Sequence, residues 1–318
     1  MIKKILITGG TGSFGKKLIK TLLENTEHLL TVYSRDEMKQ FMLNESLENN
    51  PKLNFIIGDV RDQNRLDFAM DNIDVVIHAA AMKIVMTAEE NPIEAIKTNI
   101  LGAMNVIEAC KKNNVKKVIA LSTDKACNPV NLYGATKLCS DKLFIAANSE
   151  NKNSTKFSVV RYGNVIGSRG SVIPFFNSIK HKGIFPVTDK RMTRFWITLD
   201  QAVKFVQKNL IRMHGGEIFV PKIPSMKIID LAKAIAPKNK IKIIGIRPGE
   251  KLHEVMIGKD DARNTIEIKD CYIIQPEFDW WSKTNYQKSK KVTENFEYNS
   301  ELNHDFLSIE SLKDLVTG

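Results

Sequence analysis

The stretch Thr8-Gly9-Gly10-Thr11-Gly12-Ser13-Phe14-Gly15 lies between an apolar run and a helical pattern. Glycine lets the backbone turn tightly and approach a pyrophosphate, and the following helix offers free N–H groups and the positive end of its dipole. Because the loop joins a predicted strand to a predicted helix, this spacing indicates nucleotide binding rather than an ordinary turn. The candidate cofactor-binding residues of the loop are Gly9, Thr11, Gly12, Ser13, Phe14 and Gly15.

Short apolar runs and helical patterns alternate outward from this loop. Strands are predicted over residues 3–8, 29–34, 54–58, 74–78, 116–122 and 157–161, and helices over residues 13–24, 64–70, 92–113, 132–147 and 199–213. Apolar strands separated by helices indicate a parallel sheet covered on both faces. We therefore predict an α/β fold, a doubly wound parallel sheet of the Rossmann type, with a smaller C-terminal α+β substrate domain.

The predicted cofactor-binding domain covers residues 1–165, and residues 190–222 are expected to return to it. The predicted substrate-binding domain covers residues 166–318, and its last ~25 residues are polar and expected on the surface.

Composition narrows the possible partners. The 318 residues are 43% apolar and 26% charged, which is typical of a globular protein, and no apolar stretch reaches the roughly 20 residues of a membrane-spanning helix. The net charge of +11 is spread over scattered lysine pairs, which indicates a lysine-rich surface rather than a nucleic-acid site. With no signal-peptide pattern, no Cys-x-x-Cys pair and isolated histidines, we expect a cytoplasmic protein without a metal.

The end of the second predicted strand favours NADP as the cofactor. Folds that bind NAD usually have an acidic residue here, whereas Ser34 and Arg35 suit a 2′-phosphate. Lys39, one helical turn further, supports this interpretation, and Asp36 weakens it. Asp59, followed by Val60, ends the third strand, where its carboxylate can reach an adenine amino group.

Tyr133 and Lys137 are four residues apart and share one helix face. An ammonium group near a phenol lowers the pKa of the phenol. Tyr133 could then accept a proton from a sugar hydroxyl while hydride leaves the same carbon. Thr123 ends the fifth predicted strand, where its hydroxyl can hydrogen-bond to the same substrate oxygen.

Asp124 and Lys125 follow Thr123 directly, and simple alcohol oxidation needs neither of them. Elimination of water across C5–C6 of a 4-keto sugar needs a base for the C5 proton and an acid for the C6 oxygen. We assign Lys125 as the base and Asp124 as the acid. Because the pKa of a free lysine is about 10.4, we expect burial, Lys137 or a bound cationic cofactor to lower the pKa of Lys125.

These residues together resemble the extended short-chain dehydrogenase/reductase family over roughly the whole chain. Four longer stretches are similar to the inverting UDP-N-acetylglucosamine 4,6-dehydratases of that family, which open the pseudaminic acid pathway for glycosylation of flagellin and other surface structures. The stretches are LSTDKACNPVNLYGATK (121–137), RYGNVIGSRGSVIP (161–174), RMTRFW (191–196) and RPGEKLHE (247–254).

The resemblance implies NADP as cofactor, UDP-N-acetylglucosamine as substrate and a homo-oligomer, either a dimer or a hexamer. The catalytic residues would be Thr123, Asp124, Lys125, Tyr133 and Lys137. Further cofactor contacts would come from Ala79, Ala80 and Lys83 as well as Tyr133 and Lys137. Substrate contacts would come from Lys83, Asn99, Asn164, Arg169, Gly170, Ser171, Val172, Arg194, Arg247 and Glu250.

One segment departs from the family pattern. After Lys83 the family usually continues with His or Gln and then Val-Pro, whereas this chain has Ile84-Val85-Met86. The change affects the expected rate or sugar preference more than the reaction class. Three other functions stay open: a capsular-sugar dehydratase, a UDP-sugar C4 epimerase, and a non-catalytic NADP-binding sensor, although such sensors typically lose the Tyr-Lys pair.

Overall fold

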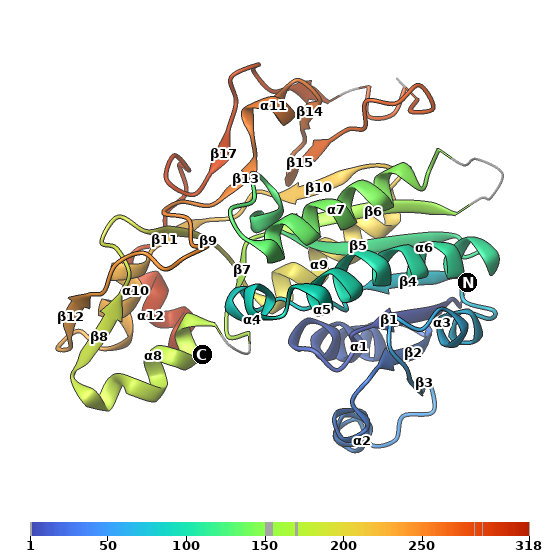
Figure 1. Cartoon of the computed structure of the whole chain (residues 1–318), viewed down its shortest axis with the longest axis horizontal. Helices are drawn as coiled ribbons and strands as arrows, with labels where there is room; N and C mark the ends of the chain where they lie inside the picture. Colours follow the sequence, from blue (N-terminus) through green and yellow to red (C-terminus); the bar gives the residue numbers. More distant parts are fainter. Residues whose placement is uncertain (1, 150–154, 169–170, 283, 288, 318) are drawn as a thin grey trace.

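A ten-stranded sheet runs through the middle of the molecule (Figure 1). The computed structural model describes residues 2–149, 155–168, 171–282, 284–287 and 289–317. The strand order is β16-β14-β15-β10-β6-β5-β4-β1-β2-β3. The parallel part consists of β1 (Lys4–Thr8), β2 (Leu29–Ser34), β3 (Leu53–Ile57), β4 (Val75–His78), β5 (Lys117–Thr123), β6 (Lys156–Tyr162) and β10 (Ile218–Pro221).

The parallel strands form because their apolar residues are buried in continuous runs. Ile5, Leu6 and Ile7 of β1 are at most 2% exposed, as expected for a strand covered on both faces. The order β3-β2-β1-β4-β5-β6 reverses direction at β1, which is the doubly wound arrangement predicted from the sequence. In such a sheet, ligands bind outside the carboxyl ends of the strands next to the reversal.

The covering helices fall into two groups. The first group packs α1 (Ser13–Asn25) against α9 (Leu199–Arg212). The second group consists of α3 (Gln63–Ala69), α6 (Gly102–Lys112) and α7 (Leu132–Ala146), which pack side by side. The predicted bounds of α1, α3, α7 and α9 are correct to within one residue at each end.

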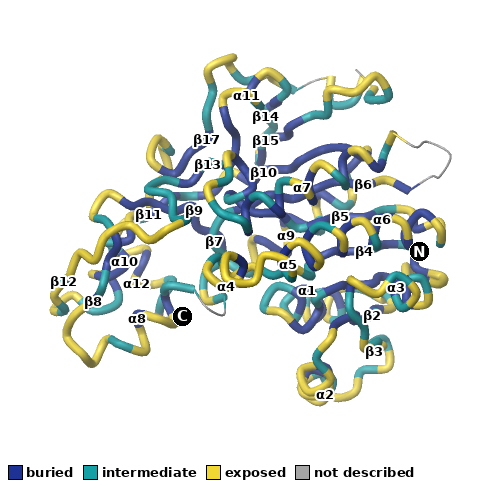
Figure 2. The backbone as a smooth tube through the Cα atoms, in the orientation of Figure 1, coloured by how far each residue is buried: buried dark blue, intermediate teal, exposed yellow. Residues whose placement is uncertain are grey.

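Two helical segments differ from the sequence-based prediction. The single helix predicted over residues 92–113 consists of α5 (Pro92–Ile96), a π-helical turn η1 (Lys97–Leu101) and α6. Helix α2 (Glu37–Ser46) was not predicted, because it buries only Gln40 and Leu43 and therefore carries no apolar stripe of helical period. Figure 2 shows α2 as a largely exposed helix beside the sheet.

A smaller lobe lies beside the sheet, at the left of Figure 1. It contains α8 (Val172–Ile179), β8 (Ile184–Val187), α10 (Ile228–Ile235), β12 (Lys240–Ile243) and α12 (Ile309–Thr317). These elements surround a second apolar core, which includes Phe176, Phe185, Met226 and Leu312. The expectation that the last ~25 residues only cover the surface is wrong, because α12 packs on α10 and Leu312 is fully buried.

Later parts of the chain also extend the large sheet. Strands β14 (Thr265–Glu267), β15 (Cys271–Ile274) and β16 (Lys290–Lys291) add to it beyond β10 in antiparallel orientation. Strand β9 (Thr193–Ile197) pairs instead with β7 (Asn164–Val165) and β11 (Ser225–Lys227). The division of the chain at residue 165 stays a prediction. Among the described residues, no helix has the length and apolarity that a membrane crossing requires.

Candidate active site

The glycine loop packs tightly against the end of β4. Gly9 has φ +66°, and a Cβ atom there would lie 2.8 Å from the amide nitrogen of Ala80. Gly12 is the N-cap residue of α1, and because glycine has no side chain, the first amides of the helix have no side-chain cap. Gly15 touches the backbone of Gly10, where a Cβ would lie 2.4 Å from the carbonyl oxygen. The loop and helix α1 therefore form a narrow cradle of backbone N–H groups that fits a pyrophosphate.

Arginines gather at the predicted ribose end of this cradle. The guanidinium group of Arg35 lies 3.4 Å from the carboxylate of Asp59, which also binds Arg61 at 2.7 Å. Burial would raise the pKa of Asp59, but hydrogen bonds from Arg61 and the charges of both arginines outweigh it and lower the pKa. Asp59 is therefore an anion that holds two cations at the tip of β2.

Other residues at this tip bind one another. Asp36 caps α2 by accepting from the amide of Lys39 at 2.9 Å, and the Lys39 ammonium also pairs with its carboxylate. The Ser34 hydroxyl accepts from Gln40 at 3.0 Å. Val60 is buried against α6. Because the Asp36 carboxylate already binds the amide and the ammonium group of Lys39, it is less available to a ribose hydroxyl. Asp36 therefore argues less strongly against NADP than the sequence alone indicates.

Helix α7 places Tyr133 next to the end of β5. A Cβ atom at Gly134 would lie 2.2 Å from the carbonyl oxygen of Lys125, so only glycine allows the helix to approach this closely. Asn131 caps the helix by accepting from the amide of Gly134 at 2.7 Å, and it donates to the carbonyl of Gly249 at 2.7 Å. The start of α7 is thus tied both to the catalytic turn and to the 247–254 segment.

Three of the predicted catalytic residues, Thr123, Asp124 and Lys125, form one hydrogen-bonded group. The Thr123 hydroxyl donates to Asp124 Oδ1 at 3.0 Å, and the Lys125 ammonium lies 3.0 Å from the same oxygen. Asp124 and Lys125 lie in the short helix η2 (Asp124–Ala126) that directly follows β5. Glu254, which comes just before β13 (Val255–Ile257), adds a second carboxylate 3.2 Å from Lys125 Nζ. Glu254 also lies 3.7 Å from Arg194 Nε.

The expected depression of the pKa of Lys125 is wrong for this arrangement. Burial lowers the pKa of Lys125, but the Asp124 and Glu254 carboxylates outweigh burial and raise it above its ordinary value. Burial raises the pKa of Asp124, Lys125 opposes this change, and Glu254 adds to it. Lys125 is therefore an ammonium group in the free protein, next to a carboxyl group that has become easier to protonate.

The pKa of Tyr133 also differs from the expectation. Burial raises the pKa of Tyr133 to about 12, while Lys125 and a hydrogen bond with Thr123 lower it. The cation that opposes burial most is thus Lys125 rather than Lys137. Burial lowers the pKa of Lys137, and Asp141, one turn further along α7, opposes this change.

Two residues of the predicted substrate site have open polar atoms. Asn164 Oδ1 and the Ser171 hydroxyl are buried and have no hydrogen-bond partner among the described residues. Buried polar atoms without partners are rare in folded proteins, so both are candidates for ligand contacts. Ser171 precedes α8, which begins at Val172. Arg169 and Gly170 lie outside the described residues.

Two of the remaining predicted substrate residues, Arg194 and Asn99, use their polar groups in hydrogen bonds within the protein. Arg194 is buried and donates to the carbonyl oxygens of Thr193, Lys251 and Leu252 at 2.7–3.1 Å. Asn99 binds both backbone groups of Met82, at 2.8 and 2.9 Å, and donates to Thr136 at 3.0 Å. Their roles as substrate contacts stay predictions, as do those of the exposed Lys83 and of Arg247, whose guanidinium lies 3.9 Å from Glu250.

Sequence reasoning assigned no role to Glu254 or Asp141. Glu254 lies within the RPGEKLHE stretch, but no local pattern links it to Lys125. The carboxylate of Asp141 accepts from the Ser122 hydroxyl at 2.7 Å and pairs with Arg161 at 3.3 Å, all three being buried. The position of Asp141 one helical turn after Lys137 was the only available signal.

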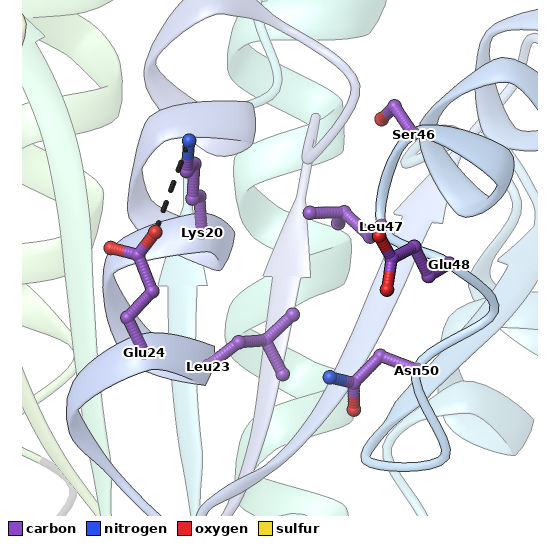
Figure 3. A pocket seen from close by; sticks show the side chains of 7 residues that line it. All are labelled: Lys20, Leu23, Glu24, Ser46, Leu47, Glu48 and Asn50. Carbon is purple, nitrogen blue, oxygen red and sulfur yellow. Dashed lines mark ion pairs between the residues drawn. The ribbon is translucent and has the colours of Figure 1, made fainter.

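A separate hollow of about 260 Å³ lies between α1 and the loop after α2 (Figure 3). Its lining residues are Lys20, Leu23, Glu24, Ser46, Leu47, Glu48 and Asn50. Lys20 and Glu24 are near the carboxyl end of α1, whereas the glycine loop precedes the helix. The hollow is therefore at the end of α1 remote from the catalytic residues, and it is not part of the candidate active site.

Comparison with known proteins shows the family of this chain. The profile of the polysaccharide biosynthesis protein family matches residues 5–276. The inverting UDP-N-acetylglucosamine 4,6-dehydratase of Campylobacter jejuni is 58% identical and aligns with 99% of this chain and 97% of its own. The UDP-glucose 4-epimerase of Rickettsia canadensis is 43% identical over 99% of this chain and 95% of its own.

The fold also agrees with a solved structure. The crystal structure of Pen from Bacillus thuringiensis superimposes with a TM-score of 0.91 at 39% identity, covering 99% of this chain and 97% of that chain. The predicted resemblance to the inverting dehydratases is thereby confirmed, and the chain belongs to the polysaccharide biosynthesis protein family.

Proposed function

We propose that this protein is a UDP-N-acetylglucosamine 4,6-dehydratase that inverts C5. The product would be UDP-2-acetamido-2,6-dideoxy-β-L-arabino-hex-4-ulose. The observation that carries the proposal is the direct contact of Asp124 with both Thr123 and Lys125 at the carboxyl end of β5. An acid–base pair suited to elimination thus adjoins the Thr-Tyr-Lys group suited to oxidation. The full-length relative at 58% identity bears the name of this activity.

The cofactor would be NADP. The backbone of Gly9–Gly15 would bind its pyrophosphate, and Arg35, with Arg61 beside it, would face the 2′-phosphate. When bound, the nicotinamide would accept hydride from C4 of the sugar and return it at C6. Ser34, Lys39, Asp59, Val60, Ala79, Ala80 and Lys83 would complete the cofactor site.

The protein side chains would move the protons of the reaction. Because burial raises the pKa of Tyr133 to about 12, Tyr133 must first lose its phenolic proton to solvent. As a phenolate next to Thr123 and Lys137, it then takes the proton of the C4 hydroxyl group. Because Lys125 carries a proton in the free protein, it must lose that proton before it can act as a base. Asp124 Oδ1, 3.0 Å away, is the acceptor in our proposal. Transfer of this one proton gives a neutral amine and a neutral carboxylic acid, which are the two forms that elimination requires.

Elimination then proceeds from these two forms. The Lys125 amine removes the C5 proton, which the adjacent C4 ketone makes acidic. Asp124 protonates the C6 oxygen, and water leaves. Reprotonation of C5 from the opposite face inverts the configuration.

The UDP moiety would bind between the sheet and the smaller lobe. The open Asn164 Oδ1 and Ser171 hydroxyl support this location. Arg169, Gly170, Val172, Arg194, Arg247, Glu250 and Asn99 would complete the substrate site.

The cellular setting is also a proposal. The family description supports a role in polysaccharide biosynthesis, and we place this role at the start of pseudaminic acid synthesis in the cytoplasm. Exposed apolar side chains on neighbouring helices support a homo-oligomer. They include Ile93, Ile96, Leu101 and Met104.

Incubation with UDP-N-acetylglucosamine in deuterated water tests the reaction. The expected product has lost one water, carries deuterium at C5 and has the inverted configuration. Lys125→Ala should lower the rate of water loss by at least about a hundredfold, the contribution of a general base, and leave NADP binding unchanged. Lys116→Ala, at an exposed surface pair with Asp74, is the control. A product without C5 deuterium would end the proposal.

A UDP-sugar C4 epimerase is the second candidate, since a relative of that name is 43% identical over nearly the whole chain. Oxidation at C4 is common to both reactions. Epimerisation conserves mass, so a product with the mass of the substrate would favour the epimerase.

A further inference from the structure

Glu254 is a buried acid that the proposed mechanism does not use. It is 2% exposed, its Oε1 lies 3.2 Å from Lys125 Nζ and 3.7 Å from Arg194 Nε, and its Oε2 has no hydrogen-bond partner among the described residues. Asp124 Oδ2, in the same group, is likewise buried without a partner. Two open carboxylate oxygens around one lysine are typical of a reactive site rather than of a structural ion pair.

Backbone hydrogen bonds, rather than the Glu254 carboxylate, fix the position of the segment around Glu254. The amide of Glu254 donates to the Ser300 hydroxyl at 2.9 Å, and its carbonyl oxygen accepts from the amide of Ser300 at 2.8 Å. Strand β13 then pairs with β17 (Tyr298–Asn299). Because the backbone is fixed on both sides of the residue, the side chain is presented to Lys125 at a set distance.

We propose that Glu254 is a positioning residue for the dehydration step, which holds the Lys125 ammonium beside Asp124 and sets the pH range in which the pair is active. This inference rests on the proposed function. Glu254 comes from the segment after the Arg247 turn and Lys125 from the sheet, so the contact also joins the two halves of the site.

The surrounding charges define the expected effect. Glu254 faces Lys125 and Asp124 from η2, Arg194 from β9 and Lys251 from its own loop, and Tyr133 of α7 lies beyond Lys125. Burial would raise the pKa of Glu254, but Lys125, Arg194 and Lys251 outweigh burial and lower it. Glu254 is therefore an anion, and removing its charge lowers the pKa values of both neighbours, Lys125 and Asp124.

The test is the pH dependence of water loss in Glu254→Gln. If the reaction requires a single proton on the Asp124–Lys125 pair, the rate of water loss has a bell-shaped dependence on pH. The acid and alkaline limbs of this profile report the two pKa values of the pair. Loss of the nearby anion should displace both limbs to lower pH. On the alkaline limb, each unit of displacement lowers the rate tenfold. The KM for UDP-N-acetylglucosamine should stay within about twofold of the wild-type value.

Two further variants distinguish the effect of the Glu254 charge from a structural effect of the substitution. Glu254→Asp keeps the charge, so its profile should stay at the wild-type position with a lower maximum, because the shorter side chain loosens the contact with Lys125. Glu301→Gln removes an exposed carboxylate that lies 3.5 Å from His253, and its profile should match the wild type.

The outcomes are distinct. A Glu254→Gln profile that is lowered but not displaced shows a structural role and overturns the inference, as does an unchanged profile. If Glu254→Gln does not fold, a displaced Glu254→Asp profile overturns the inference, as does an undisplaced, lowered profile with a raised KM, whereas an undisplaced, lowered profile with an unchanged KM supports it. If the wild type and Glu301→Gln bind NADP but release no water from the sugar nucleotide, the proposed function itself fails.

Discussion

A single methyl group at Gly134 tests how closely α7 must approach the catalytic turn. In Gly134→Ala, the added carbon would lie 2.2 Å from the carbonyl oxygen of Lys125 and 3.1 Å from Pro129 Cβ. The first distance is far inside van der Waals contact, so α7 and η2 must separate by about 1 Å. Such overpacking costs about 1–3 kcal/mol.

Helix propensity acts in the opposite direction. Alanine is favoured over glycine within a helix by about 0.5–1 kcal/mol. At the midpoints of these two ranges, the net expectation is a loss of about 1.3 kcal/mol. With an unfolding entropy of about 2.1 cal/mol/K per residue, a chain of 318 residues should lose about 2 °C in Tm. Because a shift of about 1 Å can cost about a hundredfold in rate, turnover should fall far more than stability.

Thermal unfolding and the rate of product formation measure the two effects. Gly258→Ala is the matched control, because its Cβ would meet nothing closer than 3.5 Å, and its φ of −81° suits any residue. A Gly134→Ala protein with a higher Tm and wild-type turnover would show that propensity outweighs the contact. The close approach of α7 to Lys125 would then be refuted.

Three further predictions concern buried charge and the cofactor. Burial and the charge of Lys137 lower the pKa of His78 to about 3, so the folded state should lose stability as pH falls from about 6.5 towards 3. In His78→Gln this slope, measured by urea unfolding at several pH values, should decrease by up to about 1.4 kcal/mol per pH unit. Asp141→Asn should cost about 3 kcal/mol in urea unfolding, because the buried Arg161 then keeps only the longer ion pair with Asp261 at 3.9 Å. Asp67→Asn, at a surface pair, should cost less than about 1 kcal/mol. Arg35→Ala should weaken NADP binding by about tenfold or more in a titration and leave NAD binding unchanged.

The parallel sheet was predictable because its strands are buried on both faces. Their apolar runs are continuous, and the glycine loop after β1 fixes where the sheet reverses. The π-helical turn η1 was not predictable, because a pattern of period 3.6 continues through it. Asn99 within η1 clamps Met82 and Thr136, which explains why the helix is interrupted there.

Helix α2 was not predicted because its sequence lacks a helical pattern of apolar residues. Met38, Phe41 and Met42 are all at least 57% exposed, so the apolar positions of the segment do not mark a buried face. The segment therefore lacks the amphipathic stripe by which a helix is predicted. The helix is instead set by its capping residue, Asp36, which accepts from the amide of Lys39.

The close grouping of the candidate catalytic residues was predictable from their spacing in the sequence, and the direction of the pKa shift of Lys125 was not. Thr123, Asp124 and Lys125 are consecutive, and Tyr133 and Lys137 share a helix face, so local spacing places all five. The pKa of Lys125 depends on Glu254, which lies 129 residues later in the chain and comes within 3.2 Å of Lys125 Nζ. Sequence spacing carries no information on such a contact, and the expected sign of the shift was wrong for this reason.

The arrangement around Thr123 explains how one fold can serve both oxidation and elimination. Its hydroxyl contacts Tyr133, to which we assign the oxidation, and donates to Asp124, to which we assign the elimination. All these groups except Tyr133 come from one backbone segment, the end of β5 and the turn after it. A change of the two residues after Thr123 would therefore alter the step after oxidation at C4 without moving the groups that perform the oxidation. A UDP-glucose 4-epimerase is 43% identical over nearly the whole chain, and in our proposal the two activities diverge in the step that follows oxidation at C4.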